Sequence, residues 1–118
     1  MVNFTIRNES GYSCLKVLRN RFDTLISPEI KAQLVLLSNG GARNIIMDLE
    51  DCEYCDSSGL GAILVGNRLC EGTEGTFILC NLSVGVEKII KLAMLDTILL
   101  ITSGFKEAEE LLIKKTEL

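Results

Sequence analysis

Apolar residues recur along this chain with two spacings, which predict strands alternating with helices. Alternating or continuous apolar runs predict strands at residues 2–7, 13–18, 44–49, 76–80 and 97–101. The first two are expected to form a hairpin through the turn at 8–11. The continuous apolar run at 44–49 is typical of a central strand that is buried on both faces.

Helical spacing predicts four helices between and after these strands. Ser27, Ser83 and Ser103 are placed to act as N-caps of three of them, and the first is expected to end at Asn39–Gly40–Gly41. The order β-β-α-β-α-β-α-β-α predicts an α/β fold with a mixed, mostly parallel sheet covered by helices. We expect residues 1–118 to form a single domain.

The remaining helix starts in the centre of the chain, at the stretch Asp56–Ser57–Ser58–Gly59–Leu60–Gly61, and runs to about Glu71. The stretch follows the buried strand at 44–49, which places Ser57 or Ser58 at a helix N-terminus, with Asp56 or Ser57 as its cap. Backbone N–H groups there are unpaired and the helix dipole is positive, so the position suits a phosphate as well as a hydroxyl. We interpret this serine as a switch, against the alternative that the serines are plain helix caps.

The two sides of this helix differ when successive residues are turned by about 100°. The side expected to face the core carries Gly59, Ala62, Ile63, Gly66, Leu69 and Cys70. Leu60, Leu64 and Arg68 gather on the opposite side, close to Ser57. An apolar pair beside a candidate switch indicates a contact patch for another protein, unless a loop or a neighbouring helix covers it.

Charge and composition exclude several classes of function. The net charge is −4 and the twelve Lys and Arg residues are scattered, which argues against nucleic-acid binding. No apolar run is long enough to span a membrane and no signal peptide is visible, so we expect a cytoplasmic protein without a membrane contact. The chain contains no histidine. We therefore expect no enzymatic activity, no metal site and no cofactor.

Five cysteines leave one alternative open. Cys52 and Cys55 form a C-x-x-C pattern, which is found in redox pairs and in halves of zinc sites. No second pair or histidine completes a zinc site. We favour the interpretation that all five thiols are small apolar core groups, and a redox pair at Cys52 and Cys55 is the alternative.

The stretch from Asp48 to Gly61, with its core Asp-Ser-Ser-Gly-Leu-Gly, resembles the signature of STAS domains, in particular the bacterial anti-sigma factor antagonists. The resemblance extends from the first strand to the last helix and implies the same order of elements. It also implies a cycle in which the unphosphorylated protein binds an anti-sigma factor that is a serine kinase, and so releases a sigma factor for transcription. The kinase phosphorylates the first serine after the aspartate, here Ser57, and a serine phosphatase restores it.

The resemblance further implies roles for the neighbouring residues. Asp23 matches an acidic residue that the family keeps near the phosphorylation site, and the phosphosite environment is completed by Asp56, Ser58 and Gly59. The expected partner-binding residues are Leu60, Gly61, Leu64 and Arg68. Arg21 and Cys55 depart from the family's pattern. Similar domains also occur in sensory and lipid-transport complexes, so an interaction module without a phosphoswitch is the alternative function.

Overall fold

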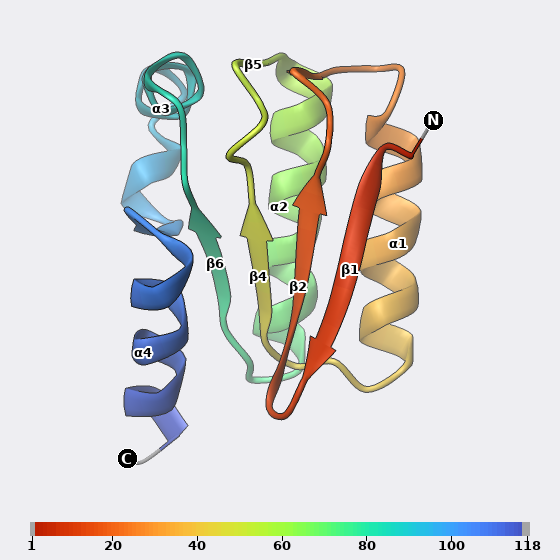
Figure 1. Cartoon of the computed structure of the whole chain (residues 1–118), viewed down its shortest axis with the longest axis vertical. Helices are drawn as coiled ribbons and strands as arrows, with labels where there is room; N and C mark the ends of the chain where they lie inside the picture. The colour runs from red at the N-terminus through yellow and green to blue at the C-terminus, as the bar shows by residue number, and fades with distance from the viewer. Residues whose placement is uncertain (1, 117–118) are drawn as a thin grey trace.

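A five-stranded sheet with the strand order β1-β2-β4-β6-β7 is the centre of the computed structural model, which describes residues 2–116 (Figure 1). Its strands are β1 (Phe4–Glu9), β2 (Tyr12–Val17), β4 (Ile45–Asp48), β6 (Phe77–Cys80) and β7 (Leu100–Thr102). Only β1 and β2 pair antiparallel, and the other neighbours are parallel. The predicted α/β fold with a mixed, mostly parallel sheet is therefore confirmed.

Two very short strands escaped the prediction. β3 (Arg21–Phe22) and β5 (Tyr54–Cys55) pair in parallel as a separate two-stranded sheet. Two residues are too few to show the period of a strand, and their partners lie more than thirty positions apart. Strands so far apart in sequence pair only when the chain folds, so a local pattern of residues cannot reveal them.

The helices are α1 (Ser27–Asn39), α2 (Ser57–Gly72), α3 (Val84–Leu92) and α4 (Phe105–Thr116). α1 ends as predicted, with Gly41 in the left-handed region at φ 101°, and Ser83 caps α3 by accepting a hydrogen bond from Val86 N at 3.2 Å. The strand predicted at 97–101 is wrong in its first part. A short 3₁₀ helix, η1 (Leu95–Thr97), precedes the three-residue strand β7.

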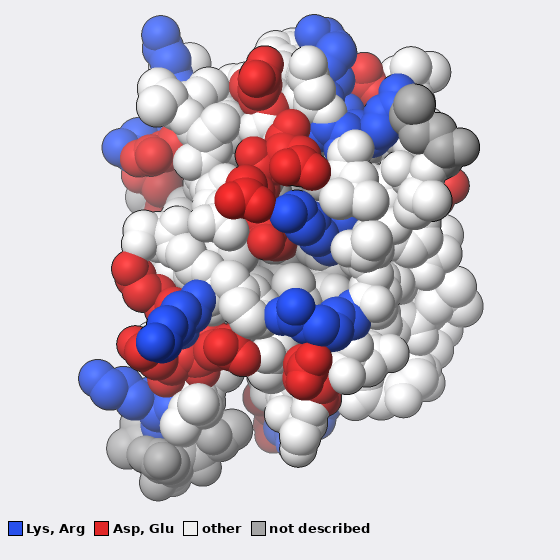
Figure 2. All heavy atoms as spheres, viewed as in Figure 1, with Lys and Arg blue, Asp and Glu red and all other residues white. Residues whose placement is uncertain are grey.

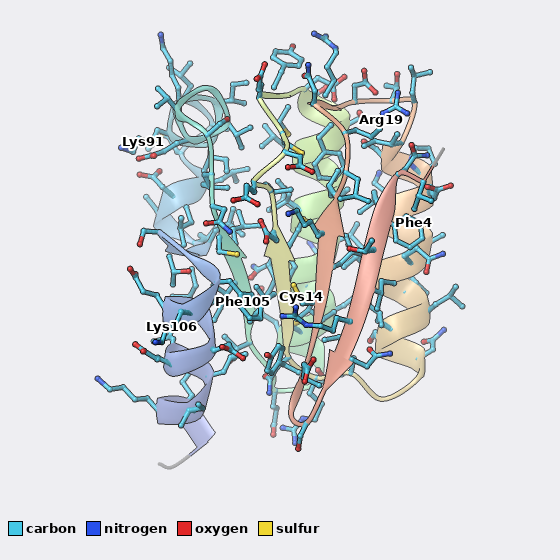
Figure 3. All side chains as sticks on the ribbon, in the orientation of Figure 1. Phe4, Cys14, Arg19, Lys91, Phe105 and Lys106 are labelled. Carbon is cyan, nitrogen blue, oxygen red and sulfur yellow. The ribbon has the colours of Figure 1, made fainter. Side chains whose placement is uncertain are left out.

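The sheet has a helix layer on each face. Ile45 and Met47 of β4 point to the larger core shared with α1, α2 and α3, whereas Ile46 points to a smaller core beneath α4. The buried members of the smaller core are Cys14, Ile46, Ile78, Cys80, Ala108 and Leu112. Figure 3 shows Cys14 on the sheet close to Phe105 of α4. All four residues of β4 and of β6 are buried, which confirms the central position expected for the apolar run at 44–49.

The carboxyl ends of β2, β4 and β6 lie at one edge of the sheet, at the top of Figure 1. The strand β5 and the first turn of α2 lie at the same edge. Within residues 2–116, each helix is too short or too polar to cross a bilayer.

Candidate functional site

The first turn of α2 follows β5 directly, and Asp56 is its N-cap. Oδ1 of Asp56 accepts hydrogen bonds from Ser58 N at 2.9 Å and Gly59 N at 3.1 Å, and the Ser58 hydroxyl donates to the same oxygen at 2.6 Å. These hydrogen bonds, led by that from the Ser58 side chain, hold the pKa of the Asp56 carboxyl below its ordinary value. The expectation that the N–H groups of this turn are unpaired is therefore wrong for Ser58 and Gly59.

Ser57 and Ser58 are adjacent in sequence, but their hydroxyls have different surroundings. Ser58 is half-buried, and its hydroxyl lies between Asp56 and Ser27 of α1. Ser57 is exposed, and its hydroxyl makes no hydrogen bond within the part of the chain that the structure describes. The pattern of the sequence left both serines as candidates, and their contacts separate them. Only the Ser57 hydroxyl is open to a second protein.

A short chain of hydrogen bonds connects Ser58 with the start of α1. Oγ of Ser27 lies 3.1 Å from Oγ of Ser58, and the Ser27 hydroxyl donates to the Asp23 carbonyl at 2.7 Å. Oδ1 of Asp23 accepts from Leu25 N at 3.0 Å, which closes the turn that leads into α1. The prediction that Ser27 caps α1 is wrong, because Ile26 is the N-cap. The buried Ser27 hydroxyl instead connects the start of α1 with Ser58 of α2.

Gly59 allows the turn to lie directly on the small sheet. A Cβ atom at this position would lie 2.4 Å from the Phe22 carbonyl oxygen and 2.7 Å from Sγ of Cys55. One of these atoms belongs to the backbone and cannot move aside without shifting β3. Gly66 has a similar role on the same face about two turns further along, where a Cβ would lie 2.4 Å from the ring of Phe77. The predicted close approach of α2 to the sheet is confirmed at both glycines.

The outward side of α2 is less exposed than the sequence suggested. Leu60 is half-buried and packs against the larger core, Leu64 is half-buried, and Arg68 is exposed. The core side is as predicted for Gly59, Ala62, Ile63, Gly66 and Cys70, which are all buried, while Leu69 is half-buried. Leu60 and Leu64 therefore offer a narrower apolar surface beside Ser57 than a fully exposed pair.

Three apolar side chains that the sequence analysis missed lie at this same edge. Leu25, in the turn after Asp23, is 81% exposed, and Val84, the first residue of α3, is 86% exposed. Tyr54 of β5 is 39% exposed. α3 starts close to the loop before β5, since a Cβ at Gly85 would lie 2.6 Å from the Glu53 carbonyl oxygen. No periodicity marks these residues, because they come from three separate segments of the chain.

Arg21, which departs from the family's pattern, has a defined place in β3. Its guanidinium lies 4.4 Å from the centre of the Tyr54 ring, and its Nε lies 3.6 Å from Oδ2 of Asp23. It also lowers the pKa of the Asp56 carboxyl to a lesser degree than the hydrogen bonds do. Arg21 thus links the small sheet to Asp23 on one side of the site.

Acidic side chains dominate the loop between β4 and β5. The loop and its flanks carry Asp48, Glu50, Asp51 and Glu53, and Figure 2 shows acidic side chains gathered above the end of β4. Lys16 of β2 forms an ion pair with Glu50 at 2.9 Å. Acidic and basic side chains are mixed at the lower left of the face in view, and much of its right side is uncharged. The electrostatic environment on this side of the site is therefore negative.

Cys52 and Cys55 lie in the core below the site. All five cysteines are free and buried, and burial raises the pKa of both Cys52 and Cys55 to about 12. A thiol with this pKa is almost entirely protonated at neutral pH, and the thiolate is the reactive form. The structure therefore favours the apolar interpretation of these two cysteines over the redox alternative.

Comparison with known proteins identifies the family. The model of the STAS domain matches residues 9–108. A putative anti-sigma factor antagonist from Thermotoga maritima superposes with a TM-score of 0.83 at 24% identity, over 92% of this chain and 93% of that one. The Bacillus cell fate determinant SpoIIAA in its phosphorylated form has a TM-score of 0.71 at 24% identity, over 91% and 96%.

A third structure, described as the stressosome, a signal integration and transduction hub, has a TM-score of 0.77 at 15% identity, over 97% of this chain and 100% of that one. These identities show a common fold, and the family model covers most of the chain. The chain belongs to the STAS domain family and has the fold of its anti-sigma factor antagonists.

Proposed function

We propose that this protein is a phosphorylation-controlled anti-sigma factor antagonist that acts in the cytoplasm as a single STAS domain. Its unphosphorylated form binds an anti-sigma factor that is a serine kinase, and so frees a sigma factor. Phosphorylation of Ser57 ends the binding, and a serine phosphatase restores it. The protein is itself not an enzyme: Ser57 is the substrate of its partners' active sites.

The observation that supports this proposal best is the contrast at the first turn of α2. Ser57 carries the exposed hydroxyl, while Asp56, Ser58 and Gly59 hold the turn in place. A kinase needs a serine that it can reach, and a switch needs a scaffold that keeps its shape in both states. The contacts of this turn meet both requirements.

Charge supplies the physical mechanism of release. A phosphate adds about −1.5 to −2 charges at neutral pH. A partner that covers Ser57 also covers apolar side chains at the same edge, among them Leu25 and Val84. Burying a charge against such a surface is costly unless a counter-charge accompanies it. The phosphorylated protein therefore loses its partner while its own core, which lies on the other side of α2, is unaffected. In this proposal Leu60, Gly61, Leu64 and Arg68 contact the partner.

The test is mass spectrometry of the protein purified from its own cells under conditions that preserve phosphate. We expect a single phosphate, located on Ser57 by fragmentation, and no phosphate on Ser58. A tagged Ser57→Ala variant serves as the matched control, since it should stay unmodified. A protein that is unmodified through growth and stress, or is modified elsewhere, contradicts the proposal.

A second candidate is an interaction module of a larger sensory or lipid-transport assembly, without a phosphoswitch. Large apolar side chains are exposed on α3, η1 and their flanks, away from Ser57: Leu92, Met94 and Ile98 are 77%, 70% and 58% exposed. Exposed apolar groups at one place often mark protein contacts. Light scattering of the purified protein and of a Leu92→Glu variant distinguishes the two, because a module of this kind should associate and the variant should not.

A further inference from the structure

The start of α2 carries no Lys or Arg that could pair with a phosphate on Ser57. The N–H groups of Ser58 and Gly59 already donate to Asp56. The Asp56 carboxylate itself repels a phosphate, and Asp23 and the acidic loop add to the repulsion. Arg21 carries a positive charge nearby, but it is engaged with Asp23 and with the ring of Tyr54. The compensating group must come from another element.

Lys31 of α1 lies in a suitable place. α1 and α2 start side by side, as the contact between Ser27 and Ser58 shows, and Lys31 is one turn after Ser27. Nζ of Lys31 lies 3.7 Å, and Cε 3.9 Å, from the position that a Cβ of Gly61 would have. The ammonium group therefore lies beside α2 at Gly61, one turn after Ser57. Lys31 forms no ion pair or hydrogen bond with any other residue among 2–116.

The position above Gly61 is also within reach of Ser57. The two residues are four positions apart in one helix, so their Cβ positions are about 5 to 6 Å apart on the same face. The ammonium group of Lys31, which lies beside the Cβ position of Gly61, is therefore about one helical turn from Ser57. Gly61 has no side chain to separate them. Rotation of the last torsions of Lys31 is then enough to bring the ammonium group to a phosphate on Ser57.

We propose that Lys31 forms an ion pair with the phosphate on Ser57 and so ties the modified start of α2 to α1. This inference rests on the proposed function, since it takes Ser57 as the modified residue. Lys31 is a positioning residue: it fixes the direction of the phosphate and neutralises part of its charge within the chain. Neutralisation from α1 lets the folded domain accept a dianion next to Asp56.

The test measures the second pKa of the phosphate by ³¹P NMR. Phosphoserine is placed at position 57 of the full chain during translation, so that no kinase is required. A neighbouring ammonium favours the dianion and lowers this pKa. We expect Lys31→Gln to raise it by at least about 0.5 unit and Lys31→Arg to return it to the wild-type value. Arg21, Asp23 and Asp56 act on the phosphate equally in all these variants.

Lys106→Gln is the matched control, because Lys106 is an exposed lysine on α4, on the opposite helix layer (Figure 3). It should leave the pKa of the phosphate unchanged. The proposal is overturned if Lys31→Gln titrates like the wild type, if Lys106→Gln has an equal effect, or if Lys31→Arg titrates like Lys31→Gln. Because phosphoserine is incorporated during translation, these outcomes are independent of whether cells phosphorylate Ser57, which mass spectrometry decides.

Discussion

The two sides of the first turn of α2 differ in almost every physical respect. The inward side, with Gly59 and Ser58, lies on the small sheet and on α1, and its hydrogen bonds and close contacts leave little freedom. The outward side, with Ser57 and Gly61, meets solvent and the flexible end of one lysine. The comparison teaches that residues one position apart in a helix can have different surroundings, which fit the structural role of Ser58 and the regulatory role that we propose for Ser57. Substitutions on the inward side should change stability, and those on the outward side should change binding.

The largest effect is expected at Gly59. Gly59→Val places a Cβ 2.4 Å from the Phe22 carbonyl oxygen, so the turn and β3 must separate, at a cost of about 3 kcal/mol or more of unfolding free energy. Gly61→Ala is the matched control: its Cβ has room, and alanine favours a helix by up to about 1 kcal/mol over glycine. Urea unfolding of both variants checks this. Equal stability of the two variants would contradict the difference between the sides.

The second-largest loss of stability is expected on substitution of Asp56, and its size should depend on pH. Asp56→Ala removes the N-cap and should cost about 1 to 2 kcal/mol at pH 7. The pKa of Asp56 is lowered in the folded state, so its stabilisation is present above the unfolded-state pKa of about 3.9 and is lost as pH falls through the folded pKa. Urea unfolding at a series of pH values should show wild type and Asp56→Asn converging in acid. A constant difference between them at every pH would argue against an ionic cap.

Ser57→Asp tests the outward side. The charge should leave the unfolding free energy within about 0.5 kcal/mol of the wild type, because the side chain is exposed. Binding to the anti-sigma factor that tagged Ser57→Ala captures from the same cells should weaken about tenfold, or 1.4 kcal/mol, by titration calorimetry. If Ser57→Asp bound the partner with wild-type affinity, the charge mechanism would be weakened. If the variant unfolded, the outward side of α2 would also be needed for the stability of the fold.

The smallest changes in stability are expected when each of the two serines is replaced by alanine. Ser58→Ala breaks hydrogen bonds to Asp56 and Ser27 and should destabilise the fold by about 1 kcal/mol. Ser57→Ala removes a hydroxyl that faces solvent and should change stability by less than about 0.5 kcal/mol. Thermal unfolding of the two variants side by side is sufficient. The reverse order of stabilities would exchange the roles assigned to the two hydroxyls.

Much of this arrangement was contained in the local pattern of residues. The apolar runs of β4 and β6, the core side of α2 and the C-terminal end of α1 follow from spacing and from glycine, and the structure agrees with each. The motif from Asp56 to Gly61 also placed the candidate site at a strand–helix junction. Such features depend on residues that are neighbours in sequence, so a pattern can reveal them.

Three of the departures from prediction have one cause in common. Ser27 looked like a cap, but its hydroxyl is taken by contacts with Asp23 and Ser58. Leu60 looked exposed, but the larger core covers part of it. The strands β3 and β5 were missed because each is a strand only through the other. In each case a distant segment of the chain competed with the local preference.

The sequence by itself determined the family, the order of the principal elements and the stretch in which the proposed switch lies, because periodicity and a motif are properties of neighbouring residues. Only the tertiary structure decided which serine is exposed, and it also brought Lys31 from α1 onto the turn that carries Ser57. The physical reason is that exposure and charge compensation depend on how separate elements pack, and Lys31 and Gly61 meet only when α1 and α2 lie side by side.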